Sequence, residues 1–192
     1  MSDQNKKRLF IAVGIPSEIL QKMEAMQKEF KRFAREAKWV RPEGMHLTLK
    51  FLGYVDPDKI PEITNLLKPI AENQNSFSIL VRGCGFFPNS RRPTVLWTGI
   101  VSNQLEKLQK EVDDAMEKIG FEKEQHGFTP HLTLARFRDY HGLTPLILES
   151  EKWREKELGE FTARDFTLYE SILHRSGAEY QKVNTFLFPT HV

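Results

Sequence analysis

Apolar residues follow two spacings along the chain, and each spacing predicts a different kind of element. Where they alternate, or form short runs that end at glycine or proline, they predict β-strands. These segments are 9–13, 45–52, 77–85, 94–100, 131–137, 161–173 (one long strand or two short ones) and 180–188. Where they recur every three or four residues, they predict amphipathic helices. These segments are 17–33, 58–70, 103–119 and 144–156. Pro69 is expected to distort or end the second helix.

The order of these elements occurs twice, which indicates an internal duplication. The first helix of each half begins near residue 17 or residue 103, and the strands that begin near residues 46 and 131 are 85 residues apart. A strand and helix order of this kind predicts an α+β fold of two similar lobes, with helices on one face of each sheet and the other faces opposed across a cleft. We expect one bilobal domain over residues 1–192, with halves at about 7–90 and 91–190, and strand exchange between the lobes is compatible with this pattern.

Composition narrows the class of protein. The 192 residues are 40% hydrophobic and 28% charged, which is ordinary for a globular chain and disfavours disorder. No apolar run approaches the ~20 residues that span a bilayer. The single cysteine, Cys84, fits a reducing cytoplasm. A net charge of +2 is too balanced to indicate strong nucleic-acid binding, so any anionic ligand must be held by local charge.

The tetrapeptide His-Leu-Thr-Leu occurs at residues 46–49 and again at 131–134, at equivalent points of the duplication. Side chains in a strand alternate between faces, so His46 and Thr48 should share one face, as should His131 and Thr133. The positions predicted to pack on the opposite face are Leu47, Leu49, Phe51, Leu132 and Leu134. One such motif is weak evidence, but two with the same parity favour a joint site.

Two imidazoles and two hydroxyls suit acid-base chemistry on a phosphate. Histidine titrates near pH 6.5, so one ring of a pair can accept a proton while the other donates one. Threonine hydroxyls donate hydrogen bonds to phosphoryl oxygens. Opening a phosphodiester needs a base, an acid and donors for the non-bridging oxygens, so the motifs predict a phosphodiesterase.

Further segments carry a family resemblance. The paired motifs resemble those of the 2H phosphoesterases, and so do the segments RLFIAV, WVRPEGMHLTLKFLG, GCGFFP, FTPHLTLARF and FTLYESIL, the last followed by Gly177 and Tyr180. More narrowly, they are similar to RNA 2′,3′-cyclic phosphodiesterases, also called 2′-5′ RNA ligases. The resemblance implies duplicated ferredoxin-like lobes with pseudo-two-fold symmetry and a hydrolase that uses no metal or cofactor. It also implies that His46 is the proton donor, that His131 is the proton acceptor and that Thr48 and Thr133 bind the phosphate.

Two basic residues near the motifs have more than one interpretation. Family members often place a basic residue at the position of Arg136, where it contacts the substrate phosphate. Strict alternation puts Arg136 on the face opposite His131, so either the strand bulges or Arg136 is a solvated residue at the strand end. Lys50 has the parity of His46, but we interpret it as an exposed lysine at a strand edge.

The predicted activity is hydrolysis of a terminal 2′,3′-cyclic phosphate on RNA to a 2′-phosphate, and its reversal with a 5′-hydroxyl RNA would form a 2′-5′ linkage. The nearest alternative is a related enzyme that acts on a small cyclic nucleotide or a 2′-5′ oligoadenylate. An alternative from another class is a non-catalytic RNA-binding module. We expect a cytoplasmic monomer whose partners are RNA ends or small nucleotides, with no metal and no membrane contact.

Overall fold

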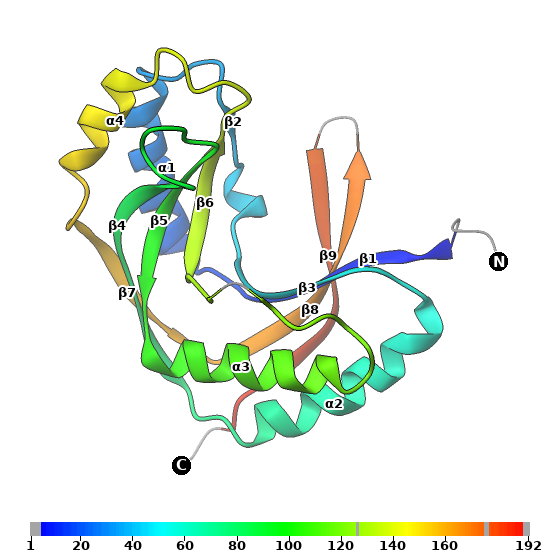
Figure 1. Cartoon of the computed structure of the whole chain (residues 1–192). Helices are drawn as coiled ribbons and strands as arrows, with labels where there is room; N and C mark the ends of the chain where they lie inside the picture. Colours follow the sequence, from blue (N-terminus) through cyan, green and yellow to red (C-terminus); the bar gives the residue numbers. More distant parts are fainter. Residues whose placement is uncertain (1–4, 126, 175–176, 190–192) are drawn as a thin grey trace.

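A computed structural model describes residues 5–125, 127–174 and 177–189 of the chain (Figure 1). Its strands are β1 (Lys7–Val13), β2 (Lys38–Trp39), β3 (Leu47–Val55), β4 (Phe77–Phe87), β5 (Val95–Val101), β6 (His131–Arg136), β7 (Glu157–Ala163), β8 (Asp165–His174) and β9 (Gly177–Leu187). Its helices are α1 (Ser17–Lys31), α2 (Ile60–Glu72), α3 (Asn103–Glu117) and α4 (Thr144–Glu151), with short 3-10 turns η2 (Pro42–Gly44) and η3 (Pro57–Lys59). The segment 161–173 therefore contributes to two strands. Pro69 does not end α2, which continues to Glu72.

The strands form two sheets in which every pairing is antiparallel, so the predicted α+β class is confirmed. One sheet has the order β3-β1-β8-β9 and the other has the order β2-β6-β5-β4-β7. Without β2 the two orders correspond, with β3 equivalent to β6 and β1 equivalent to β5. The four-stranded sheet combines β1 and β3 with β8 and β9, which come from opposite ends of the chain. The expected boundary near residue 90 falls between β4 and β5, which pair with each other in the five-stranded sheet. The division into lobe halves stays a prediction.

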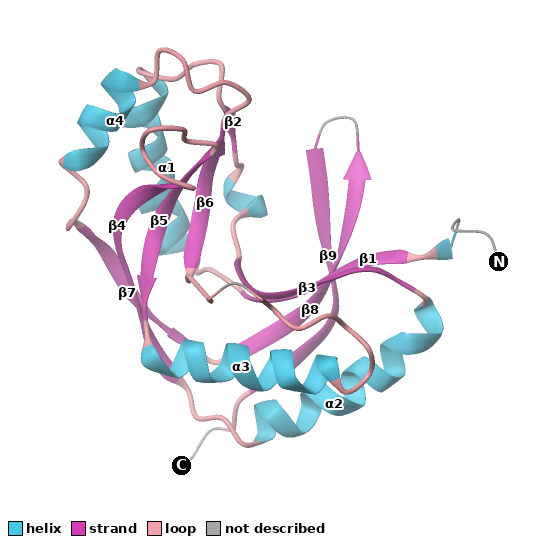
Figure 2. Cartoon of the chain, viewed as in Figure 1, coloured by secondary structure: helices cyan, strands magenta, loops and turns pink. Residues whose placement is uncertain are grey.

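The helices also cross between the sheets (Figure 2). Helix α1 follows β1 of the four-stranded sheet but packs against β7 and α4 on the five-stranded sheet. Helix α3 follows β5 of the five-stranded sheet but packs against β3 and α2 on the four-stranded sheet. Buried apolar residues of both helices, including Met23, Phe30, Leu108 and Val112, account for this docking. The exchange ties the two sheets to each other.

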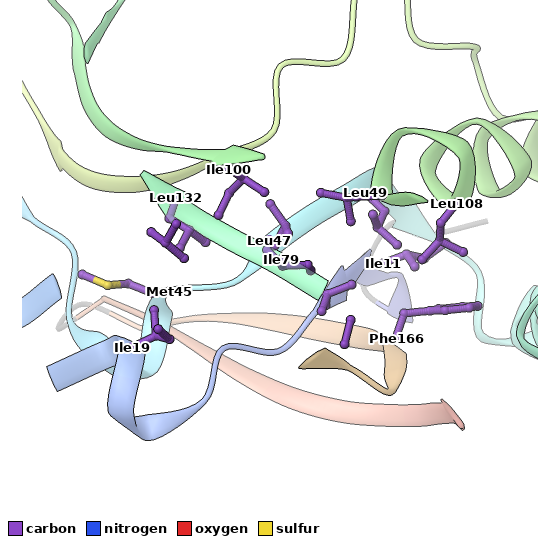
Figure 3. Packing of buried hydrophobic residues seen from close by; sticks show 14 of the residues in the cluster. Ile11, Ile19, Met45, Leu47, Leu49, Ile79, Ile100, Leu108, Leu132 and Phe166 are labelled. Atoms are coloured by element: carbon purple, nitrogen blue, oxygen red, sulfur yellow. The ribbon is translucent and has the colours of Figure 1, made fainter. Parts of the chain in front are cut away.

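Most of the buried apolar residues form one continuous cluster, part of which is drawn in Figure 3. Leu47 and Leu49 of β3 belong to it, and so do Leu132 and Leu134 of β6, as the alternation predicts. The two motif strands are therefore anchored by fully packed faces. A packed interior holds side chains in fixed positions, which gives the opposite faces of both strands a rigid backing.

Both motif strands contain a β-bulge at the same position of the motif. In β3, Thr48 pairs with Ala12 and Lys50 pairs with Ile11, so Leu49 is the extra residue. In β6 the extra residue is Leu134, because its two neighbours pair with successive residues of β5. A bulge shifts the alternation by one residue, so the side chains after it change faces. This shift decides where three of the predicted residues lie.

Candidate active site

His46 lies immediately before β3, in a pocket of aromatic rings. Its ring centroid is 4.5 Å from that of Phe10 and 4.8 Å from that of Tyr180, which meets it edge to face. Burial lowers the pKa of His46 to about 4, because an imidazolium loses hydration in these surroundings. A hydrogen bond with the backbone of Gly44 acts in the opposite direction and offsets only part of that effect. The free protein therefore holds His46 neutral at pH 7.

His131 is the first residue of β6, and its setting repeats that of His46. The ring of Phe87 meets it edge to face, with 4.8 Å between the centroids. Its Nδ1 lies 2.7 Å from the carbonyl oxygen of Thr129, two residues earlier, just as Gly44 precedes His46 by two residues. A carbonyl only accepts, so Nδ1 carries the proton and neutral His131 has its lone pair on Nε2. Burial lowers the pKa of His131, the hydrogen bond with Thr129 raises it and the charge of Arg136 lowers it further.

The bulge in β6 brings Arg136 to the face that carries His131. Leu134 and Ala135 are both buried, so the alternation resumes one residue late and Arg136 is exposed on the side of Thr133. Of the two interpretations of Arg136, the bulged strand is the one observed. Thr48 and Thr133 are both partly exposed, and no side-chain hydrogen bond within residues 5–125, 127–174 and 177–189 engages their hydroxyls.

The bulge in β3 overturns two expectations for the same physical reason. Phe51 was expected in the core, but its side chain is 62% exposed and its ring lies 6.0 Å from that of Phe10, beside His46. Lys50 was expected to be exposed, but it is 7% exposed. It forms an ion pair with Asp113 of α3 and donates to the carbonyl of Glu122 at 2.7 Å. The bulge turns Lys50 toward the helix and Phe51 toward the open face, where Phe51 occupies the position equivalent to Arg136.

A cavity of about 680 Å³ adjoins both halves of this arrangement. Gly44 and Tyr180, which neighbour His46, line it on one side, and Arg136 lines it on the other. Its remaining walls come from β2 and the segment after it, and from β8 and β9; Figure 1 shows where these elements lie. A smaller cavity of about 460 Å³ lies over the five-stranded sheet beside Thr129. Residues next to each histidine therefore line a cavity: Gly44 and Tyr180 beside His46 line the larger one, and Thr129 beside His131 lines the smaller one.

Two general features of the described chain bear on partners. Its residues contain no group of three or more His, Cys, Asp or Glu side chains arranged to hold a metal ion. None of its helices, as far as the structure describes them, combines the length and the apolar character needed to cross a bilayer.

Sequence reasoning assigned no role to the aromatic residues that surround the histidines. Phe10, Phe87 and Tyr180 all belong to the family resemblance, but Tyr180 is far from either motif in the chain. Alternation along β1 places Phe10 on the face opposite Leu9 and Ile11, which was the one available signal. No spacing rule connects Tyr180 with His46, because their contact depends on the pairing of β8 with β9.

Two corresponding sheets, each with a histidine at the start of a strand and a threonine two residues later, are the arrangement of a 2H phosphoesterase. The particular family follows from the sequence: this chain belongs to the LigT-like phosphoesterases. The family's model, described as LigT like Phosphoesterase, matches residues 13–97 and 99–180. The resemblance seen in the sequence is thereby confirmed.

The similarity to known proteins covers nearly the whole chain. It is 36% identical to the RNA 2′,3′-cyclic phosphodiesterase of Methanocaldococcus jannaschii over 179 residues, which cover 92% of this chain and 98% of that protein. It is 33% identical to the protein of the same name from Archaeoglobus fulgidus, with 93% and 99% covered. A crystal structure of a Thermus thermophilus protein superimposes with a TM-score of 0.80 at 26% identity, over 94% of this chain and 97% of that one. Escherichia coli LigT complexed with 3′-AMP has the same fold, with a TM-score of 0.79 at 24% identity over 96% and 99%.

Proposed function

We propose that this protein is an RNA 2′,3′-cyclic phosphodiesterase, which opens the terminal cyclic phosphate of an RNA and leaves a 2′-phosphate. The relatives with this name cover nearly the whole chain and support the assignment. The observation that carries it is the repeated site: two identical motifs, each with the same bulge, present a histidine whose ring is hydrogen-bonded to the backbone two residues earlier. That contact orients each ring and leaves its second nitrogen for a substrate.

In the proposed reaction His131 is the base and His46 is the acid. Nε2 of His131 removes a proton from water while the water oxygen attacks phosphorus in line with the 3′ oxygen. The bond between phosphorus and the 3′ oxygen breaks, and His46 donates its proton to that oxygen. The products are a 3′-hydroxyl and a 2′-phosphomonoester. The hydrogen bond of Nδ1 with Thr129 supports this role for His131, because it places the lone pair on Nε2.

The acid role requires that His46 gains a proton when substrate binds. Its pKa of about 4 in the free protein means that few molecules carry this proton at pH 7. A phosphate anion beside the ring favours the imidazolium and raises that pKa. The substrate thus helps to create its own proton donor. Burial of His46 also favours the proton transfer itself, because an imidazolium in a poorly hydrated site readily gives its proton to the leaving oxygen.

Three further side chains are proposed to bind the reacting phosphate. The hydroxyls of Thr48 and Thr133 lie on the open faces of their strands and donate to non-bridging oxygens, and the guanidinium of Arg136 balances the charge that develops on phosphorus. Together with the imidazoles they supply the proton transfers and the charge stabilisation, so we propose a metal-independent reaction without a cofactor. The reverse reaction, with a 5′-hydroxyl RNA in place of water, would give 2′-5′ ligation. Monomeric state and cytoplasmic location stay predictions.

Product analysis tests the proposal. A short oligoribonucleotide that ends in a 2′,3′-cyclic phosphate is incubated with the protein in the presence of excess chelator, and the ends are identified by phosphorus NMR. We expect conversion to the 2′-phosphate at the same rate with and without the chelator. Loss of turnover that only added divalent metal restores would refute the metal-independent reaction. Turnover of 2′-5′ oligoadenylate or a small cyclic nucleotide but not of RNA would favour the alternative substrates, and binding of RNA without turnover would favour a binding module.

A further inference from the structure

Two cations lie directly opposite each other on neighbouring strands beside the proposed site. Lys38 of β2 and Arg136 of β6 are Cα partners in the antiparallel register, so their side chains project from the same face. Both are exposed, and both line the 680 Å³ cavity. Directly opposed residues have Cβ atoms roughly 5 Å apart, and like charges at such positions destabilise a sheet.

Neither of these two charges has an ion-pair partner in the described part of the chain. Two other strand cations have acidic partners: Lys7 pairs with Glu170 at 2.5 Å and Arg82 pairs with Glu155 at 2.5 Å. For Lys38 and Arg136, no carboxylate among residues 5–125, 127–174 and 177–189 lies within ion-pair distance. Two neighbouring cations that destabilise the sheet when it is empty form a favourable site for an anion, which offsets their repulsion.

Other charged and aromatic residues line the same cavity. Its other cation is Arg41, and its acidic residues are Glu43 and Glu179. Glu179 accepts hydrogen bonds from His174 at 3.1 Å and from Gln181 at 2.9 Å, so its carboxylate is held by β8 and β9 themselves. The aromatic rings of Trp39 and Tyr180 complete the walls. An open cavity with cations on one strand pair and aromatic rings beside them suits a single-stranded nucleic acid, which offers phosphates and bases together.

We propose that Lys38 binds the phosphodiester that precedes the reacting nucleotide of an RNA strand, while Arg136 beside it contacts the reacting phosphate. The inference rests on the proposed function and extends it. The terminal nucleotide carries its only other phosphate on the 5′ oxygen, and Lys38 lies opposite Arg136 in the same cavity, where it can contact that phosphate. A 2′,3′-cyclic mononucleotide lacks that phosphate. The protein therefore prefers an oligoribonucleotide to a mononucleotide, and Lys38 is a source of this preference.

The test compares two substrates and two charge-matched variants. The substrates are an oligoribonucleotide with a terminal 2′,3′-cyclic phosphate and the corresponding cyclic mononucleotide. The variants are Lys38→Gln and, as the control, Lys28→Gln on the exposed face of α1, which removes the same charge away from the cavity. Both lysines are exposed, so both variants should fold, and urea denaturation checks this. The kcat/KM values are measured across a series of salt concentrations.

For the oligoribonucleotide, Lys38→Gln should lower kcat/KM about three- to tenfold, the effect of one exposed charged contact with phosphate. It should also reduce the slope of log kcat/KM against log salt by about 0.7, as expected when one phosphate contact to a single strand is lost. Mononucleotide turnover should be the same in both variants and in the wild type.

Three results would overturn the inference while the proposed function stands. They are an unchanged oligoribonucleotide rate in Lys38→Gln, an equal loss in Lys28→Gln, and an equal loss on the mononucleotide. A wild-type protein that hydrolyses neither substrate would instead refute the proposed function.

Discussion

Burial of His46 predicts an acid sensitivity that a single substitution removes. The pKa of His46 is lowered to about 4, whereas the unfolded chain has the ordinary value of 6.5. Between these values the unfolded state binds a proton and the folded state does not, so the free energy of unfolding falls as the pH falls through this range. The stability is fully present above pH 6.5. At 1.36 kcal/mol for each pKa unit, the complete loss is about 3 kcal/mol, of which roughly 2 kcal/mol falls between pH 7 and pH 4.5.

Urea denaturation at pH 7 and pH 4.5 measures this loss in the wild type and in His46→Gln, which cannot be protonated. We expect the wild type to lose roughly 2 kcal/mol more than the variant on acidification. His141→Gln is the control, because the His141 side chain is 77% exposed and its pairing with Asp139 at the surface contributes little. Equal acid sensitivity of the wild type and His46→Gln would refute the reasoning, since it would mean that burial does not penalise the charged ring.

Three further predictions concern the site and its support. The profile of kcat/KM against pH should have both limbs below pH 6.5, because the pKa values of His46 and His131 are both lowered. The kcat profile should lie at higher pH, because bound phosphate favours protonated His46. A kcat/KM optimum above pH 7 would contradict this. Lys50→Met should cost about 3–5 kcal/mol in urea denaturation, because it leaves Asp113 buried without its partner, and a cost below about 1 kcal/mol would contradict the buried pair. Thr133→Val should lower kcat/KM by about ten- to a hundredfold with little change in stability, and unchanged turnover would exclude its proposed contact with phosphate.

The two motif strands show which features the sequence pattern of a single strand can predict. Burial of Leu47 and Leu132 follows from alternation, because each strand needs one apolar face against the core. Alternation fails after Leu49 and Leu134, where each strand bulges. A bulge depends on the register with the neighbouring strand, which the residues of one strand do not encode. This is why Lys50 and Phe51 were placed on the wrong faces and why two interpretations of Arg136 stayed open.

The contacts between distant segments were beyond sequence reasoning for a related cause. Periodicity identifies the buried face of α1 but not the sheet that receives it, and α1 crosses to the other sheet. Strand β2 has only two residues, too few for any periodicity, and the side chain of Gln27 holds the chain beside it by donating to the carbonyls of Val40 and Leu134 at 2.8 and 2.9 Å. Lys38 consequently escaped notice as a neighbour of Arg136.

The central claim is that His46 and His131 act together on one phosphorus atom. The most direct measurement is the single-turnover rate of cyclic-phosphate hydrolysis at saturating oligoribonucleotide, for the wild type, His46→Ala, His131→Ala and the double variant. Each single variant should lose about 10²- to 10⁴-fold, and the double variant should be little slower than either, because groups that act in one step are strongly non-additive. A near-normal rate in either single variant, or a double variant whose loss is the product of the two single losses, would contradict the claim.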